Sequence, residues 1–314
     1  MLLTWVASLL LLGSSVSPQG QLTLELAGES LEVVEKEAYL LPVSPGLPVI
    51  DPDKLEKLLL KVERRVYQEP KNATTDEAGK LVAERNGRQL DRFALEQALY
   101  QGMYEGAGAK IDVPVQLILP RVDRQLLTQL AEKRIGTYTT YFNTNNRNRV
   151  NNIALSAKSL HNYVVFPGEV FSFNKVVGMR TKEKGYKEAP VIVRGEISEG
   201  VGGGICQVSS TLFNAVDRAG LHIVQRYSHS RQVPYVPPGR DATVSWYGPD
   251  FKFQNKYAYP ILIRTYSKFG QVSVTIHSFN EIEYDPRVVP GMFTELYEVD
   301  VQDLVNEKNT PPSP

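Results

Sequence analysis

The first half of the chain alternates between helix-like and strand-like hydrophobic patterns. Hydrophobic residues in 55–66 recur at i, i+3, i+4, i+7 and i+11, the spacing of one buried helix face, and Asp53 stands where a helix cap belongs. A second helix is predicted from its cap Asp91 to Met103. Between the helices lies Asn86-Gly87, a dipeptide favoured in two-residue hairpins because both turn positions need positive φ.

Residues 111–119 are rich in β-forming side chains and follow the second predicted helix. The two helices, the hairpin and this strand together predict an αββαβ unit. Residues 22–50 predict one or two strands and a Pro-rich linker, so we assign 22–120 to a small accessory domain. A third helix is predicted within a linker at 121–139, where the composition changes.

The second half of the chain predicts a larger, strand-rich domain over 140–280. Valine and isoleucine in 272–276 alternate with polar residues at period two, which predicts a strand with His277 on its solvated face. One strong helix is predicted over 207–219, with Gly220 in the left-handed conformation after its end. Because helices and strands occur in segregated runs, both domains are predicted to be α+β.

Both ends of the chain have patterns of their own. Residues 2–12 are an apolar run followed by small residues, which predicts a secretory signal peptide or an N-terminal anchor over 1–21. We therefore expect an exported protein, either secreted or held at the membrane by this segment. Residues 281–314 are predicted to be a C-terminal extension, and its Pro-rich end is predicted to be disordered.

Composition excludes several classes of function. Thirty-five basic residues balance 35 acidic residues, so no field over the whole chain attracts nucleic acid, and no nucleic-acid partner is expected. A single cysteine, Cys206, excludes an internal disulfide framework and a structural zinc site built from cysteines. No histidine spacing predicts a metal site, and no cofactor is expected. Cys206 is thus an inert buried thiol, a reactive thiol or an intermolecular bridge.

Cys206 follows three consecutive glycines at the start of the predicted helix. A helix start offers unpaired N–H groups and the positive end of the dipole, which stabilise a thiolate. Gly203 and Gly204 would let a substrate backbone approach the sulfur, and the N–H groups of Cys206 and Gln207 could face a developing oxyanion. Residues alone leave an alternative, a small buried side chain after a tight strand-to-helix turn.

A nucleophilic thiol needs a proton acceptor and usually a group that orients the acceptor. His229 lies in a polar, turn-prone loop, where a base can reach a bound substrate, so it is the predicted base. Asp241 is the predicted orienting group. His222, at the start of an apolar strand, is predicted to be a core histidine, and His161 is predicted to lie on the surface.

Polar side chains around His229 are candidates for substrate binding. Arginine grips carboxylates in a bidentate fashion, so Arg226, Arg231 and Arg240 are candidates for a substrate carboxylate. Ser228 and Tyr235 complete the predicted binding residues. Each arginine could equally be a surface salt-bridge partner, and the residues alone leave both roles open.

Four segments, in this order, resemble the VanW family: 149–153 (RVNNI), 167–174 (PGEVFSFN), 202–212 (GGGICQVSSTL) and 226–241. The resemblance covers about 140–278. Residues 51–120 resemble the peptidoglycan-binding module that precedes VanW domains in bacterial cell-envelope proteins. VanW takes its name from vancomycin-resistance clusters, and family members are connected with peptidoglycan cross-linking as L,D-transpeptidases that lack the usual YkuD fold.

The resemblance implies an enzyme on the cell-wall side that acts on peptidoglycan stem peptides. It implies Cys206 as the nucleophile and makes His229 and Asp241 its partners. The expected reaction is L,D-transpeptidation, which forms 3-3 cross-links through a thioester on Cys206. Two alternatives stay open: a carboxypeptidase or endopeptidase with the same nucleophile, and a non-catalytic protein that binds stem peptides or glycopeptides.

Overall fold

The protein divides into two compact units, described here from a computed structural model. Residues up to Ala73 together with Ala83–Arg121 form the first unit, and Thr74–Val82 together with the chain from Val122 form the second. The structure describes residues 20–41, 49–76, 78–105, 108–193 and 196–291.

The first unit is built on a three-stranded sheet in the order β2-β1-β8. Its strands are β1 (Gln21–Leu26), β2 (Glu29–Glu35) and β8 (Ala109–Asp112). β1 runs antiparallel to β2 and parallel to β8, and its Leu22 and Leu24 are fully buried. The αββαβ prediction is therefore incomplete, because a segment it left outside the unit supplies the central strand.

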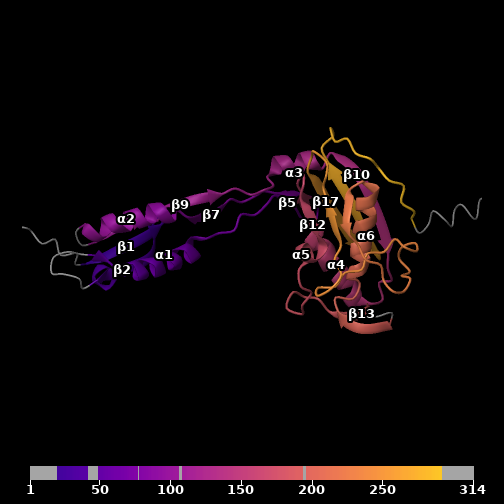
Figure 1. Cartoon of the computed structure of the whole chain (residues 1–314), viewed down its shortest axis with the longest axis horizontal. Helices are drawn as coiled ribbons and strands as arrows, with labels where there is room; N and C mark the ends of the chain where they lie inside the picture. Colours follow the sequence, from indigo (N-terminus) through magenta and orange to yellow (C-terminus); the bar gives the residue numbers. More distant parts are fainter. Residues whose placement is uncertain (1–19, 42–48, 77, 106–107, 194–195, 292–314) are drawn as a thin grey trace, which may run out of the picture. The chain divides into compact units, whose positions relative to one another are not determined.

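Both helices predicted for this unit form (Figure 1): α1 (Pro52–Val66) and α2 (Arg92–Tyr104). All the hydrophobic residues of the α1 pattern are buried, as predicted. The cap of α1 is Asp51 instead of Asp53, because the Asp51 carboxylate accepts hydrogen bonds from the backbone N–H groups of Asp53 and Lys54. Asp91 caps α2 as predicted.

The hairpin predicted at Asn86-Gly87 does not form. β7 (Gly87–Leu90) instead pairs antiparallel with β9 (Val115–Ile118). A Cβ atom at Gly87 would lie 2.4 Å from the carbonyl oxygen of Gln68, so the glycine permits a close approach of two chain segments rather than a turn. The remaining short elements of this unit are η1 (Lys36–Tyr39), β3 (Leu40–Leu41) and β4 (Val49–Ile50).

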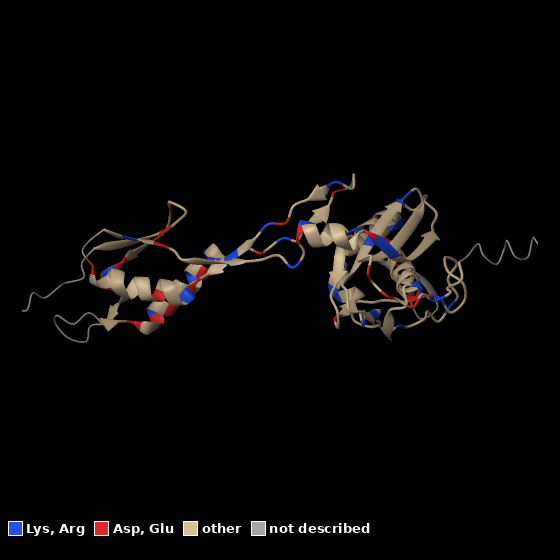
Figure 2. Cartoon of the chain, turned by 90° about the horizontal axis from the view of Figure 1, so that it is seen from above, with Lys and Arg blue, Asp and Glu red and all other residues tan. Residues whose placement is uncertain are grey.

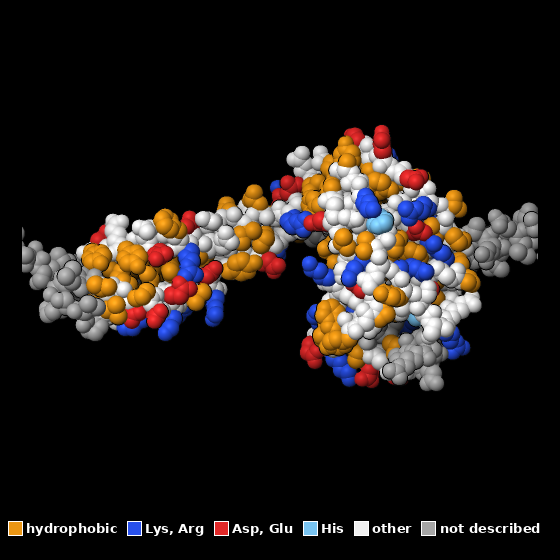
Figure 3. Space-filling view, viewed as in Figure 1, with side chains coloured by type: hydrophobic (Ala, Val, Ile, Leu, Met, Phe, Trp, Pro, Cys, Tyr) orange, Lys and Arg blue, Asp and Glu red, His pale blue; other side chains and the backbone are white. Residues whose placement is uncertain are grey.

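The surface of the first unit carries charges of both signs close together (Figure 2). On α1, for example, Lys61 and Arg65 both pair with Glu32 of β2. Hydrophobic side chains are also exposed on this unit (Figure 3), among them Phe93 and Leu117. The mixed charges agree with the neutral composition and give the unit no face of a single sign.

The second unit is built on an antiparallel four-stranded sheet in the order β10-β18-β17-β11. Its strands are β10 (Lys133–Tyr141), β11 (Tyr163–Val165), β17 (Ile261–Lys268) and β18 (Gln271–Ser278). The helices α4 (Arg147–Leu160) and α6 (Ile205–Arg218) pack against this sheet (Figure 1). Val272, Val274 and Ile276 of β18 are fully buried, as their alternation predicts.

His277 differs from its prediction as a solvated residue. The short helix α3 (Arg124–Leu130) contacts β17 and β18, and the His277 side chain is half-buried. Burial, with help from the charge of Arg264, lowers the pKa of His277 to about 4. The sheet is therefore covered in part on the face that the alternation assigns to solvent.

The boundaries of the second unit also differ from those predicted. The linker helix predicted within 121–139 ends at Leu130, because residues 133–141 form β10. The predicted extension starts too early, since Val289 is buried in the core and the Tyr138 hydroxyl donates to the Pro290 carbonyl over 2.9 Å. Residues 292–314, including the predicted disordered end, lie outside the described residues.

A second sheet and two hairpins complete this unit. The sheet has the order β12-β16-β15, and the hairpins pair β13 with β14 and β5 with β6. Their bounds, with the short helix α5, are β5 (Thr74–Thr75), β6 (Leu81–Val82), β12 (Val170–Ser172), α5 (Phe173–Val177), β13 (Glu188–Val193), β14 (Glu196–Val201), β15 (His222–Gln225) and β16 (Lys252–Gln254).

Two histidines differ from their predicted environments. His222 begins β15 and is exposed instead of lying in the core. His161, predicted on the surface, is half-buried, with its Nε2 atom 3.0 Å from the Thr75 hydroxyl of the β5-β6 hairpin. Its Nδ1 atom accepts a hydrogen bond from the Thr265 N–H. The start of an apolar strand thus failed to predict the burial of His222, and the surface prediction for His161 is wrong as well.

The predicted α+β class is confirmed by the mixture of helices and mainly antiparallel strands. In the described part of the chain, no helix combines the length and the apolar character that a membrane span requires. The predicted signal peptide or anchor falls almost entirely on residues 1–19, which lie outside the described residues.

Candidate active site

Cys206 lies in the first turn of α6, directly after the glycine loop. The helix begins at Ile205, one residue before the cysteine, and Gly204 is its N-cap with φ +103°. Gly202 also has a left-handed backbone, with φ +91°. Gly220 follows the helix end with φ +72°, as predicted. The loop therefore needs glycine for its own path, independent of any ligand.

His229 and Asp241 come from the loop that follows β15, and the structure brings both to Cys206. The His229 Nδ1 atom and the His229 backbone N–H each lie 2.6 Å from the Asp241 Oδ2 atom. The His229 ring and the Cys206 sulfur line the same cleft and lie close enough for each to shift the pKa of the other. The side chains of His229 and Asp241 are only 5% and 9% exposed, so solvent screens their interaction weakly.

These contacts change the ionisation of all three groups. Burial favours the neutral thiol, but hydrogen bonding and the charge of His229 outweigh it and lower the pKa of Cys206. Burial disfavours the imidazolium, but Cys206 and Asp241 outweigh that effect and raise the pKa of His229. The pKa of Asp241 is lowered because hydrogen bonds from His229 overcome its burial. The arrangement favours a thiolate beside an imidazolium.

The walls around the sulfur come from a segment after Asp241 and from Tyr235. The Cys206 sulfur lies 3.7 Å from the Thr243 hydroxyl and 3.5 Å from the Val244 carbonyl oxygen. Burial, followed by the negative charge on Cys206, raises the pKa of Tyr235, so its hydroxyl stays neutral. Tyr235 lines the cleft, and its contact with a substrate stays a prediction.

Cys206 opens onto a cleft of about 1040 Å³. The cleft is bounded by the glycine loop, the β13-β14 hairpin and the segment Thr243–Pro249. Trp246 and Tyr247 lie at its edge, and Tyr247 is 90% exposed. No aspartate or glutamate is found among the described residues that line it. The volume is that of a typical site for a small molecule or a few peptide residues.

Two of the predicted oxyanion residues have other roles. The Gln207 N–H donates to the Gly204 carbonyl over 3.1 Å, and its buried side-chain amide donates to the Thr140 hydroxyl and the Tyr141 carbonyl. The prediction that its N–H group faces an oxyanion is therefore wrong. A Cβ atom on Gly203 would lie 2.5 Å from the Ala189 carbonyl oxygen, so Gly203 permits the crossing of β13.

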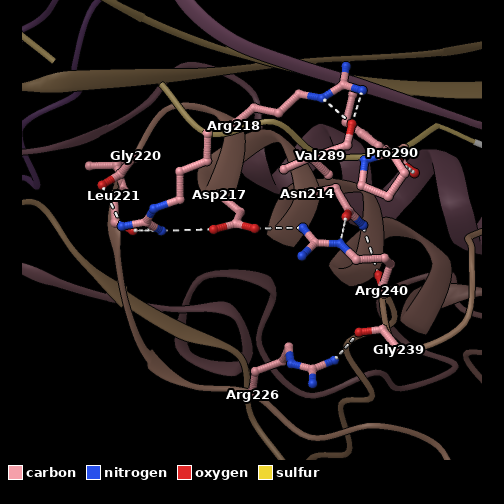
Figure 4. A network of polar contacts seen from close by, with 12 residues as sticks. Asn214, Asp217, Arg218, Gly220, Leu221, Arg226, Gly239, Arg240, Val289 and Pro290 are labelled. Carbon is pink, nitrogen blue, oxygen red and sulfur yellow. Dashed lines mark hydrogen bonds and ion pairs between the residues drawn. The ribbon is translucent and has the colours of Figure 1, made fainter. Parts of the chain in front are cut away.

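Arg240, predicted to bind substrate, lies outside the lining of the cleft (Figure 4). Its guanidinium donates to the Asn214 side chain and pairs with Asp217, each over 2.7 Å. Arg287 pairs with the second oxygen of Asp217 over 2.8 Å. Arg240 is thus paired with a carboxylate of α6 and lies outside the described lining, and its role in substrate binding stays a prediction.

Arg226 is also occupied within the protein (Figure 4). Its Nη1 atom donates to the carbonyl oxygens of Gly239 and Asp241 and to the Ser228 hydroxyl. These bonds close the loop that carries His229 and Asp241. Arg226 and Ser228 therefore act on the shape of the loop and lie outside the described lining of the cleft, and the substrate-binding role of both stays a prediction.

Two arginines that sequence reasoning missed line the cleft beside Cys206: Arg149 of α4 and Arg180, which follows α5. Burial lowers the pKa of each guanidinium, so both are cations held at a cost in solvation. Arg149 stands in the first segment of the VanW resemblance, which is the only sequence signal that could have drawn attention to it. Nothing local in the sequence distinguishes Arg180.

Metal binding has no support in the arrangement of donor side chains. In the described part of the chain, no group of three or more histidine, cysteine, aspartate or glutamate residues is placed to hold a metal ion. The chemistry available in the cleft is that of a thiolate, an imidazolium, a neutral phenol and two guanidinium groups.

Comparison with known proteins identifies the family. Residues 148–277 match the family model described as VanW like protein. The chain is 51% identical over 285 residues to the uncharacterized protein YoaR of Bacillus subtilis, covering 91% of this chain and 94% of YoaR. It is 35% identical over 113 residues to the vancomycin B-type resistance protein VanW of Enterococcus faecalis, covering 34% of this chain and 41% of that protein. No solved structure matches. The chain belongs to the VanW family.

Proposed function

We propose that this protein is an exported cell-wall enzyme that transfers an acyl group through Cys206, as a peptidoglycan L,D-transpeptidase. The observation that carries the proposal is the placement of Cys206 beside His229, whose ring is hydrogen-bonded to Asp241, at the side of a cleft. A cysteine nucleophile uses this arrangement: a base takes the proton of the thiol, and a carboxylate orients the base.

The first half of the reaction forms a thioester. The Cys206 thiolate attacks the carbonyl carbon of the L-to-D peptide bond in a tetrapeptide stem. The C–N bond breaks, and the imidazolium of His229 gives its proton to the departing nitrogen, so D-alanine leaves as the free amino acid. Because Asp241 holds Nδ1, the other ring nitrogen of His229 is the one that serves the sulfur.

The second half transfers the acyl group. The amine of a neighbouring stem attacks the thioester, His229 takes its proton, and the sulfur leaves as the thiolate with a 3-3 cross-link formed. Water in place of the amine would give a carboxypeptidase or endopeptidase. A half-buried sulfur in a cleft lined by aromatic side chains favours the amine, because the walls limit the approach of bulk water.

The proposed location at the cell wall rests on the relatives and on the apolar N-terminal segment. The name of the Enterococcus faecalis relative associates it with vancomycin resistance. We extend the proposal to the first unit as a peptidoglycan-binding accessory domain, and to residues 1–21 as the export signal or anchor. The mixed surface charge of the first unit and its exposed Phe93 and Leu117 are compatible with contact to sugar rings and peptides.

The direct test is to incubate the purified protein with disaccharide-tetrapeptide and to follow products and intact protein by mass spectrometry. We expect cross-linked dimers, released D-alanine and a thioester on Cys206. Cys206→Ala should form neither thioester nor dimer, and His229→Ala should lose about 10²-fold or more of the rate. His222→Ala, at an exposed histidine, is the matched control and should keep full activity.

Each other outcome has a defined meaning. Dimers at unchanged levels with Cys206→Ala would overturn the assignment of the nucleophile. If the protein releases tripeptide and forms no dimer, and Cys206→Ala abolishes this release, then the reaction is hydrolysis and not transfer. Measurable affinity for the muropeptide without any thioester would replace the enzyme by a binding protein.

A further inference from the structure

The glycine loop is shaped around two arginine side chains. A Cβ atom on Gly202 would lie 3.2 Å from Cβ of Arg180, and one on Gly204 would lie 2.9 Å from Cγ of Arg149. The loop thus brings both aliphatic stems against the turn that carries Cys206. This packing gives the glycines a role other than the substrate approach expected from the sequence.

Each guanidinium is held by one neutral amide. The Arg149 Nη2 atom donates to the Gln207 side-chain oxygen over 2.7 Å, and the Arg180 Nη2 atom donates to the Asn174 side-chain oxygen over 2.8 Å. An amide oxygen orients a guanidinium but brings no counter-charge; among the described residues, no carboxylate forms an ion pair with either arginine, although the charges of Cys206 and Asp250 act on Arg180. Most of the donors of each fork therefore stay available for a ligand.

Arg180 has a further unusual feature. Its Nη1 atom is buried and has no hydrogen-bond partner among the described residues. Leaving a buried cationic N–H group without a partner is costly, so such groups are rare in folded proteins unless a ligand satisfies them. Asn174 also donates to the carbonyls of Ser245 and Pro249, which line the same cleft, so Arg180 is tied through Asn174 to the segment that carries them.

We propose that Arg180, with Arg149 beside it, binds a carboxylate of the ligand in the cleft next to Cys206. The absence of acidic side chains from the described lining, the two guanidinium groups held by neutral amides and the unsatisfied Nη1 atom all select an anion with planar, bidentate geometry. In the terms of the proposed function, on which this part rests, the ligand is a donor peptide that carries a carboxylate.

Two carboxylates, one on each side of the bond that breaks, share this chemistry. One is the free C-terminus of the residue that leaves, and the other is a side-chain carboxylate on the third residue. If Arg180 binds the C-terminal carboxylate, the enzyme cleaves only the bond before the last residue of the stem peptide. Binding of the second makes it select stems with diaminopimelate over stems with lysine.

The first experiment needs no turnover and uses the single cysteine of the chain. Iodoacetate and iodoacetamide both alkylate a thiolate with loss of iodide, and they differ by one carboxylate. We expect the ratio of their rates, iodoacetate over iodoacetamide, to fall by about tenfold in Arg180→Gln and by a smaller factor in Arg149→Gln. Arg180→Lys should recover part of the ratio, because it keeps the charge but loses the fork.

Arg231→Gln is the matched control, since Arg231 is exposed and lies outside the lining of the cleft. Its rate ratio should equal that of the unchanged protein. The iodoacetamide rate and the melting temperature report whether each variant keeps its fold. A ratio that is the same in Arg180→Gln, Arg149→Gln and Arg231→Gln would overturn the proposal.

The second experiment identifies the carboxylate and uses Cys206→Ser, which blocks the thioester. Titration calorimetry compares tetrapeptides with a free or an amidated C-terminus, and with diaminopimelate or lysine at the third position. We expect a loss of about tenfold in affinity for one of these two changes. The loss should disappear when Arg180→Gln is added. Equal affinities for all peptides would overturn the assignment, whereas a failure of transpeptidation alone would leave the binding result intact.

Discussion

Two groups of arginines lie at opposite ends of α6, and they differ in what compensates their charge. At the helix C-terminal end, Arg240 and Arg287 share Asp217, while Arg226 donates to backbone carbonyls of the same loop. At the helix N-terminal end, Arg149 and Arg180 each donate to a side-chain amide and form no ion pair with a carboxylate among the described residues. The first group closes a loop, and the second group faces a cleft.

The comparison shows that residue type does not decide the role of an arginine. Arg226 and Arg240 flank His229 in the sequence, which made them the natural candidates for substrate binding. Arg240 is paired with Asp217, and the Nη1 atom of Arg226 is occupied by oxygens of its own loop. Arg149 and Arg180 come from distant segments, yet the fold brings both to the cleft beside the sulfur, and the Nη1 atom of Arg180 has no hydrogen-bond partner among the described residues.

The largest effect is expected from removing the carboxylate of the compensated group. Asp217→Asn leaves Arg240 partly buried without its counter-charge, and we expect a loss of about 2 to 3 kcal/mol in the free energy of unfolding. Denaturant unfolding measures it. Asp285→Asn, at an exposed position on the described tail, is the control. An unchanged midpoint in Asp217→Asn would show that the network contributes little.

The next effect concerns the carboxylate behind the histidine. In Asp241→Asn, His229 loses its charged partner and its pKa falls, so the thiolate is less well stabilised and the pKa of Cys206 rises. We expect the iodoacetamide rate at neutral pH to fall by about tenfold or more. An equal iodoacetamide rate in the unchanged protein and in Asp241→Asn would show that Asp241 holds the shape of the loop but does not change the ionisation of Cys206 and His229.

The pH dependence of alkylation and of transfer tests the direction of the pKa shifts of Cys206 and His229. Because the pKa of Cys206 is lowered, alkylation should remain fast at neutral pH and be lost only as the pH falls through that lowered value. Because the pKa of His229 is raised, transfer should decline as the pH rises through that raised value, where the imidazolium loses its proton. Transfer is therefore fastest between the pKa of Cys206 and the pKa of His229. Asp241→Asn should narrow this pH range, because it raises the pKa of Cys206 and lowers that of His229. Identical pH profiles for the unchanged protein and Asp241→Asn would contradict the assignment of Cys206 and His229 as a coupled pair.

The smallest effect is expected on the stability of the uncompensated group. Arg180→Gln removes one hydrogen bond to Asn174 but also a cation whose burial is unfavourable, so the free energy of unfolding should change by about 1 kcal/mol or less. Denaturant unfolding beside Asp217→Asn measures the contrast. A loss as large as that of Asp217→Asn would make Arg180 a structural residue and remove the difference between the two groups.

Much of the fold could be predicted wherever a pattern is local. The period of 55–66 predicts α1, and the alternation of 272–276 predicts β18, because each depends on one face of one element meeting a core. Asn86-Gly87 misled for the opposite reason. Gly87 is set by the distant backbone of Gln68, and a turn propensity carries no information on such a contact.

The sequence by itself determined the position of the thiol at a helix start, the histidine and carboxylate near it in the chain, and the α+β class. Those features follow from short-range chemistry: caps, periodicity and the spacing of reactive side chains. Only the tertiary structure decided which arginines face the sulfur and which are neutralised by Asp217. The physical reason is that the charge available to a ligand depends on what each guanidinium already contacts, and those contacts join residues far apart in the chain.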